Sequence, residues 1–199
     1  MPSTCASTLR RTIFLWGLKA ALISSMEPAG VRRCVLIERL SNHLDHCSNL
    51  SSHHLQEVIF VLDNSGSMRG SPLETCKRAM LTDIFPNRLH ATDKVGLIVF
   101  DSSINKRVGL GLWNGSHRSG LESTLRSVQS AGGTMMWTAL SQTIKMFSSS
   151  DNSKWLVALT DGCSGDRPDE VHRQLRTTAG QAIRVLFITV NLHHQHEQL

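Results

Sequence analysis

The stretch from Glu57 to Gly70 constrains the fold of this chain more than any other. It begins with the apolar run Val58 to Leu62, which is rich in β-branched residues and too short for a helix. This pattern is typical of a strand that is buried on both faces. The run ends abruptly in Asp63, Ser65 and Ser67, which are spaced two apart. Open parallel sheets bind their ligands at the carboxyl ends of strands, so the polar end marks a candidate site.

The chemistry of this polar loop favours a hard cation. Asp63, Ser65 and Ser67 offer three oxygen-bearing side chains from one tight loop. Mg²⁺ and Ca²⁺ take oxygen ligands, whereas softer metals prefer nitrogen and sulfur. The loop therefore supplies half of a candidate metal site, and the remaining ligands must come from elsewhere in the chain.

Further strands and helices are predicted after this loop. Apolar runs indicate strands at Val95 to Phe100, Trp155 to Leu159 and Ile183 to Val190, with an edge strand at Arg107 to Leu112. Helical patterns fill the intervals. They begin at Ser71, with Ser71 as N-cap, Pro72 at the first helical position and Glu74 closing a capping box, and this helix is expected to stop at Pro86. The other predicted helices cover residues 119–128, 136–147 and 168–180.

Strands that alternate with helices predict an α/β fold, namely a doubly wound, mainly parallel sheet with helices on both faces. Right-handed crossovers bring the carboxyl ends of parallel strands to one edge. Two more oxygen-bearing residues then reach the edge that carries Asp63. Asp161 ends the strand at Trp155 to Leu159, and Thr134 follows a pair of glycines, where it would be either a helix cap or a metal-facing hydroxyl.

These pieces resemble a known family. Three motifs occur in the order and at the element boundaries of the von Willebrand factor A-type (vWA) domain. They are Asp63-x-Ser65-x-Ser67, Gly132-Gly133-Thr134 with Ala139-Leu140, and Leu159-Thr160-Asp161-Gly162. This is the Rossmann-like class that includes the integrin inserted domains. The resemblance covers about residues 57–191.

The resemblance implies a metal-ion-dependent adhesion site loaded with Mg²⁺, with Mn²⁺ or Ca²⁺ as alternatives. Ser65 and Ser67 would be direct ligands, and Thr134 would bind directly or through water. Asp63 and Asp161 would act directly or through ordered water. Neutral hydroxyls in the inner shell leave the cation electrophilic, so that an Asp or Glu of a protein partner can replace one water. The implied function is metal-dependent protein binding, and the chain is not expected to be an enzyme.

The resemblance also sets the expected domain limits. A vWA-like domain is expected at 55–191, without the last helix, strand and helix of the family. Residues 1–54 would form an N-terminal extension with a leader similar to a transit peptide, an amphipathic helix within 31–44 and a polar linker. Residues 192–199 would form a His-rich tail.

Composition argues against several other classes of protein. Of the 199 residues, 19% are charged and 40% hydrophobic, which is ordinary for a globular protein. The net charge of +5 is spread among interspersed acids and bases, so no nucleic-acid partner is expected. The N-terminal apolar stretch is too short to span a bilayer. An odd number of cysteines without a CxxC pair favours an intracellular location over a secreted or organellar one.

Two alternatives remain open. The loop side chains could merely cap helices, which would make the domain a metal-free structural scaffold. Asp63 at the end of the first strand could also be the nucleophile of a phosphate-ester hydrolase. That chemistry needs a second Asp two residues on as general acid, and this position is Ser65.

Overall fold

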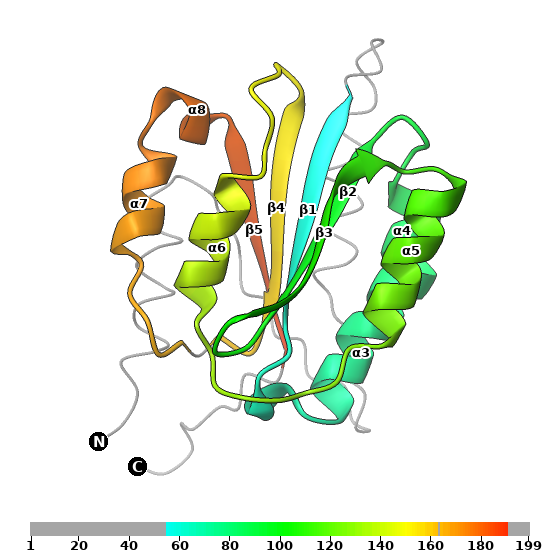
Figure 1. Cartoon of the computed structure of the whole chain (residues 1–199), viewed down its shortest axis with the longest axis vertical. Coiled ribbons are helices and arrows are strands. Elements are labelled where there is room, and N and C mark those ends of the chain that lie inside the picture. The colour runs from blue at the N-terminus through cyan, green and yellow to red at the C-terminus, as the bar shows by residue number, and fades with distance from the viewer. Residues whose placement is uncertain (1–54, 163, 191–199) are drawn as a thin grey trace, which may run out of the picture. The chain divides into compact units, whose positions relative to one another are not determined.

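The computed structural model describes residues 55–162 and 164–190, and Figure 1 shows them as one sheet flanked by helices. The predicted leader, the helix within 31–44 and the His-rich tail lie outside the described residues. Among the helices that the structure describes, none is long and apolar enough to cross a membrane.

Five strands form the sheet in the described part of the chain. They are β1 (Gln56–Asp63), β2 (Lys94–Phe100), β3 (Ile104–Leu112), β4 (Ser153–Thr160) and β5 (Ile183–Thr189). Their order across the sheet is β3-β2-β1-β4-β5, and only β3 runs antiparallel to its neighbour. The predicted α/β fold with a mainly parallel sheet is therefore confirmed.

The central strand β1 is buried on both faces, as its apolar run predicted. Every residue from Glu57 to Asp63 is buried, and Ile59, Val61 and Leu62 are completely inaccessible to solvent. Because β1 pairs with both β2 and β4, its carboxyl end lies between the ends of these two strands. The fold thus brings three strand ends together around Asp63.

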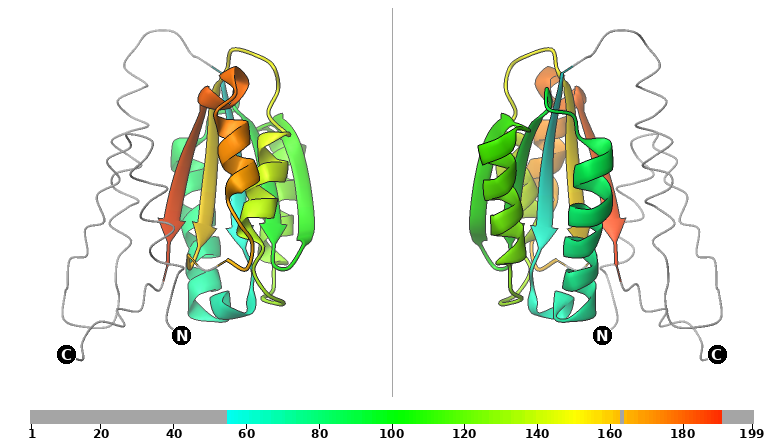
Figure 2. Two further views of the ribbon diagram at one scale, coloured as in Figure 1. Left: turned by 90° about the vertical axis from the view of Figure 1, so that its left-hand side faces the viewer. Right: turned by 90° about the vertical axis from the view of Figure 1, so that its right-hand side faces the viewer.

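Helices cover both sides of the sheet, as Figure 2 shows. One side carries α3 (Ser71–Ala79), the π-helical segment η2 (Met80–Ile84) and α4 (Phe85–Arg88). The other carries α6 (Met136–Ile144) and α7 (Asp169–Leu175). The chain moves from β1 to β2 in one direction and from β3 back to β4 in the other, so right-handed crossovers place these helices on opposite sides. The remaining helices are the short η1 (Gly66–Met68), α5 (Gly115–Arg126) beside β3, and α8 (Thr178–Gln181).

The predicted start of α3 was wrong in its chemistry. Gly70 is the N-cap, with φ at 77°, and no side chain caps the helix. The Glu74 amide donates to the Gly70 carbonyl, and the Glu74 carboxylate pairs with Lys77 at 2.9 Å instead of closing a capping box. A glycine can adopt this left-handed backbone without strain, so Gly70 turns the chain where a serine cap was expected.

The predicted stop at Pro86 was also wrong. The helix widens into the π-turn of η2 and continues as α4, where Pro86 occupies the first turn. A proline is tolerated there because the amide that it lacks has no obligatory partner in a first turn. Phe85, the first residue of α4, packs edge-on against Phe60 and Trp113.

Two other helix boundaries differ from prediction. The helix expected over 119–128 begins at Gly115. The helix expected over 168–180 divides into α7 and α8, because Thr177 interrupts it and caps α8 by accepting a hydrogen bond from the Gly180 amide. Threonine favours this role, since its side chain competes with the helical backbone for hydrogen bonds.

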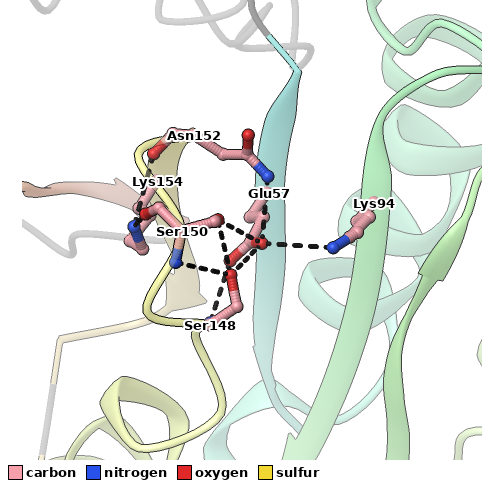
Figure 3. A network of polar contacts seen from close by, with 6 residues as sticks. All are labelled: Glu57, Lys94, Ser148, Ser150, Asn152 and Lys154. Atoms are coloured by element: carbon pink, nitrogen blue, oxygen red, sulfur yellow. Dashed lines mark hydrogen bonds and ion pairs between the residues drawn. The ribbon is translucent and has the colours of Figure 1, made fainter.

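The amino-terminal edge of the sheet is held together by Glu57, whose side chain is fully buried (Figure 3). The Ser148 amide and hydroxyl both donate to its carboxylate, which ties the loop after α6 to β1. Burial raises the pKa of Glu57, but the hydrogen bonds together outweigh it and leave the pKa below its ordinary value. The other groups around this carboxylate are the hydroxyl of Ser150, the amide of Asn152 and the ammonium of Lys94.

Candidate metal site

Asp63 lies at the carboxyl end of β1 with no exposed surface. Its Oδ1 accepts a hydrogen bond from the Ser65 amide at 2.8 Å, and its Oδ2 accepts one from the Thr160 hydroxyl at 2.7 Å. Burial raises the pKa of Asp63, and hydrogen bonds from Ser65 and Thr160 oppose this only in part. The carboxylate is thus fixed in orientation, and the hydrogen bonds compensate the burial of its negative charge only in part.

Ser65 and Ser67 follow on the short loop that η1 closes. Their hydroxyl oxygens lie 3.1 Å apart, so the two side chains point to one place. Ser65 is 1% exposed, whereas Ser67 is exposed. Ser65 is the N-cap residue of η1, but its hydroxyl makes no capping hydrogen bond. Neither hydroxyl is therefore used to cap η1 or α3.

The glycine-rich segment before α6 is bonded directly to this loop. The Gly66 amide donates to the Gly132 carbonyl at 3.0 Å, and the Ala131 amide donates to the Asn64 carbonyl at 2.8 Å. Gly132 has φ at 65°, and a Cβ at this position would lie 2.8 Å from the Asp101 carboxylate. Only glycine fits both constraints, so Gly132 lets the segment before α6 pass close to Asp101, which follows β2.

Thr134 follows this segment and is half-buried. It does not cap α6, because the N-cap residue is Met135 and no side chain at that position makes a capping bond. The helix-cap alternative for Thr134 is therefore wrong. Its backbone carbonyl accepts from the Gly165 amide at 2.8 Å, which joins it to the loop after β4.

Asp161 follows directly after β4 and is half-buried. Its negative charge contributes to the raised pKa of Asp63, so the two carboxylates are close enough to repel each other. Next to it, the Gly162 amide donates to the Thr160 hydroxyl at 3.1 Å. The three loops that carry the predicted residues thus meet at one edge of the sheet.

Several residues that build this edge had no predicted role from the sequence. Thr160 holds Asp63, and Asn64 bonds to the Gln129 carbonyl and the Asn105 side chain. Asp166 and Ser164 accept hydrogen bonds from the first amides of α6. The sequence signal for Ser164 and Asp166 was a hydroxyl and an acid shortly after Asp161. Such a pair is too common in loops to identify the partner that it bonds.

The predicted donor set consists of two carboxylates and three hydroxyls, all of them hard oxygen groups. Among residues 55–162 and 164–190, no three His, Cys, Asp or Glu side chains cluster to form a metal site of the usual acidic or zinc-like kind. A hydroxyl-rich set with a buried, oriented carboxylate suits Mg²⁺, which requires oxygen ligands and readily keeps bound waters. The residues present therefore fit this ion.

A family model for the von Willebrand factor type A domain matches residues 57–199. The chain belongs to this family. The match covers β1 from Glu57 onward, the loop that carries Ser65 and Ser67, and the ends of β2 and β4. No curated protein sequence matches the chain significantly.

Solved structures with the vWA fold agree with this assignment. A von Willebrand factor type A structure from Catenulispora acidiphila has a TM-score of 0.57 and 19% identity over 67% of this chain and 32% of its own. BatB from Bacteroides thetaiotaomicron has a TM-score of 0.53 and 24% identity over 66% of this chain and 64% of its own. Both show the fold alone.

The pilus adhesin SpaC from Lactobacillus rhamnosus GG has higher identity. It is 27% identical, with a TM-score of 0.50, over 57% of this chain. The matched part is 16% of the adhesin, so this chain spans a small share of that protein. The likeness therefore relates the vWA domain here to a domain within an adhesin.

Proposed function

We propose that this vWA domain is a protein-interaction module that binds an Asp or Glu of a partner through a Mg²⁺ ion at the carboxyl edge of its sheet. The observation that carries the proposal is that the hydroxyls at the candidate site do not cap helices. Neither Ser65 nor Ser67 caps a helix, and Thr134 is not the cap of α6. Hydroxyls that only capped helices would have supported the scaffold alternative.

Each residue has a role that its surroundings support. Ser65 and Ser67 would be direct ligands, and Thr134 would bind directly or through water. Asp63 and Asp161 would bind directly or through ordered water, and their mutual repulsion would be relieved by the ion. When bound, Mg²⁺ supplies an electrophilic centre for a carboxylate. The Ser65 amide and the Thr160 hydroxyl hold Asp63 in place.

The comparison with the pilus adhesin supports a partner that is a protein. SpaC is an adhesin and shares 27% identity with this chain over the matched part. A family in which such domains serve adhesion favours binding over catalysis. The acidic nature of the partner residue rests on the site alone, because a cation held by neutral hydroxyls attracts a carboxylate most strongly.

The hydrolase alternative fits the site poorly. Asp63 has no exposed surface, and both of its oxygens already accept hydrogen bonds. A nucleophile has to reach the phosphorus atom of its substrate, and this carboxylate would first have to leave its partners. Ser65 also stands where the general acid would be needed.

One titration tests the metal site. The thermal unfolding midpoint of the full chain is measured against increasing Mg²⁺, and then against Mn²⁺, for the wild type, Asp63→Ala and the control Asp169→Ala. Asp169 is an exposed acid in the first turn of α7. A ligand at a hundred times its Kd stabilises a protein by about 2.7 kcal/mol. We expect this stabilisation in the wild type and the control, and none in Asp63→Ala.

Two outcomes would contradict the proposal. An unchanged midpoint in the wild type would favour the metal-free scaffold, and an equal rise in Asp63→Ala would place the ion elsewhere. The hydrolase alternative makes a separate prediction, since it requires turnover of a phosphate ester that Asp63→Ala abolishes.

A further inference from the structure

The amino terminus of α6 is capped by a segment that lies almost thirty residues further along the chain. Asp166 accepts hydrogen bonds from the Trp137 amide at 3.1 Å and the Thr138 amide at 2.6 Å. Ser164 accepts from the Met136 amide at 3.0 Å and donates to Asp166. Together these two side chains satisfy the first three amides of α6.

No residue of α6 or its N-cap position caps this amino terminus through a side chain. Its N-cap residue makes no side-chain bond, and its first turn contains no acidic residue. The first amides of a helix lack partners within the helix, and a negative charge there interacts favourably with the helix dipole. Asp166 therefore supplies from a distance what α6 lacks locally.

The same segment is bonded to the residue just before the helix. The Gly165 amide donates to the Thr134 carbonyl at 2.8 Å. Residues 164–166, which we call the α6 clamp, thus bond to the chain on both sides of Met135. The clamp also begins three residues after Asp161. It therefore connects the stretch that carries Asp161 to the stretch that carries Thr134.

This connection extends to the loop of Ser65 and Ser67. Gly132 lies two residues before Thr134 and accepts from the Gly66 amide at 3.0 Å. A displaced α6 terminus would carry Thr134 and Gly132 with it. The bond at Gly66 would then be loosened, although Gly66 has no contact of its own with the clamp in this network.

We propose that Asp166 is a positioning residue for the candidate metal site. Its capping bonds to α6 hold the Thr134 segment and the Asp161 segment as one unit, so that their oxygens face the same point. Asp166 itself is not proposed as a ligand. The inference rests on the proposed function for its effect on metal binding, but its effect on the geometry of the loops can be measured without metal.

The matched control is Thr177→Ala. Thr177 also caps a helix through its side chain, with its Oγ1 3.0 Å from the Gly180 amide, but it caps α8 rather than α6. Asp166→Ala and Thr177→Ala each remove a helix cap, but only Asp166→Ala disrupts the α6 clamp. Asp166→Asn is the conservative variant, since it keeps one acceptor oxygen and loses the charge.

Two measurements on the full chain form the test. Mn²⁺ affinity is measured by calorimetry, and amide hydrogen exchange is followed at Gly66 without metal. Loss of a residue that supports metal ligands typically costs about tenfold or more in metal affinity. We expect this loss in Asp166→Ala, a smaller loss in Asp166→Asn and none in Thr177→Ala. Exchange at Gly66 should be faster in Asp166→Ala and unchanged in Thr177→Ala.

The outcomes separate the two ideas. If the wild type binds Mn²⁺ and Asp166→Ala binds it equally well, the positioning role is wrong and the proposed function stands. If the wild type binds no Mn²⁺, the proposed function fails, and exchange at Gly66 then decides on the clamp. Exchange at Gly66 that is the same in all variants overturns the inference. If Asp166→Ala does not fold, Asp166→Asn takes its place in both measurements.

Discussion

Thr160 donates its hydroxyl hydrogen to Asp63 across neighbouring strands, with 2.7 Å between Oγ1 and Oδ2. Both residues are fully buried, and each ends its strand. The Thr160 oxygen also accepts from the Gly162 amide, so the one hydroxyl fixes both the carboxylate and the turn after β4. Asp63 is oriented by strand pairing and not only by its own loop.

Removing this hydroxyl should destabilise the protein. Thr160→Val keeps the shape of the side chain but leaves Asp63 Oδ2 buried without a donor. A buried group that loses its partner costs about 1–3 kcal/mol. Urea unfolding should show this loss for Thr160→Val, and Thr160→Ser should recover most of it. Equal stability of the wild type and Thr160→Val would mean that the bond is not important for Asp63.

Neutralising Asp63 should stabilise the protein when no metal is present. Because burial raises its pKa, the folded protein holds this proton more tightly than the unfolded chain does. Stability from this group is therefore present at low pH and is lost as pH rises through the folded-state pKa. Asp63→Asn cannot ionise, so we expect it to be more stable than the wild type at pH 7 in the absence of metal.

Added Mg²⁺ should reverse this order, because only the wild type keeps a carboxylate for the ion. Denaturation of both proteins at pH 7, with and without Mg²⁺, checks the prediction. A metal-free Asp63→Asn protein that is less stable than the wild type would show that the carboxylate is well compensated without an ion.

Glu57 should produce a pH dependence of the opposite sign. Its pKa is lowered in the folded state, so its contribution is present above the ordinary value of 4.5 and is lost as pH falls through the folded-state pKa. Glu57→Gln removes the charge, and we expect it to cost about 1–3 kcal/mol at pH 7. The difference from the wild type should shrink in acid.

The control for this prediction is Glu122→Gln, which breaks a surface ion pair with Arg118. Such pairs contribute about 0–1 kcal/mol. Urea unfolding between pH 7 and pH 3 compares the three proteins. A Glu57→Gln difference that stays constant across this range would show that the loss comes from packing and not from the charge.

Alanine substitutions at two glycines with positive φ should distinguish the cost of backbone strain from the cost of a steric clash. Gly70 and Gly132 have φ at 77° and 65°, but a Cβ at Gly70 would meet no atom within 4 Å, whereas one at Gly132 would meet Asp101 at 2.8 Å. A backbone conformation with positive φ costs a non-glycine residue about 1–3 kcal/mol by itself. We expect Gly70→Ala to cost this amount in urea unfolding and Gly132→Ala to cost more. Equal losses would mean that Asp101 moves aside freely.

The sequence predicted the parts of the site that depend on local pattern. A buried run that ends in Asp63, Ser65 and Ser67 specifies a strand and a polar loop within a few residues, and alternation of strands and helices places Asp161 at the same edge. Thr160 belongs to a motif that the sequence revealed, but its role was missed because its partner depends on how β1 and β4 pair, which no local pattern reveals. Asp166 was missed for the same reason, since a cap supplied from a distant loop leaves no mark near α6.

The errors at helix ends have a similar cause. Ser71-Pro72-x-Glu74 matches a capping box, but Gly70 already turns the chain with its positive φ, so the serine became the first helical residue. Pro86 is a strong stop signal in a regular helix, but the π-turn before it lets a second helical segment begin. Both local signals are present in the sequence, but the backbone geometry next to each of them prevented its usual effect.

The most direct test of the metal site is calorimetry of Mn²⁺ binding to three proteins, namely the wild type, Ser67→Ala and Ser71→Ala. Both serines are exposed, so neither substitution should disturb the core. We expect one tightly bound ion per chain in the wild type and in Ser71→Ala, and at least a tenfold loss of affinity in Ser67→Ala. No binding to the wild type, or equal binding to all three proteins, would contradict the proposed metal site.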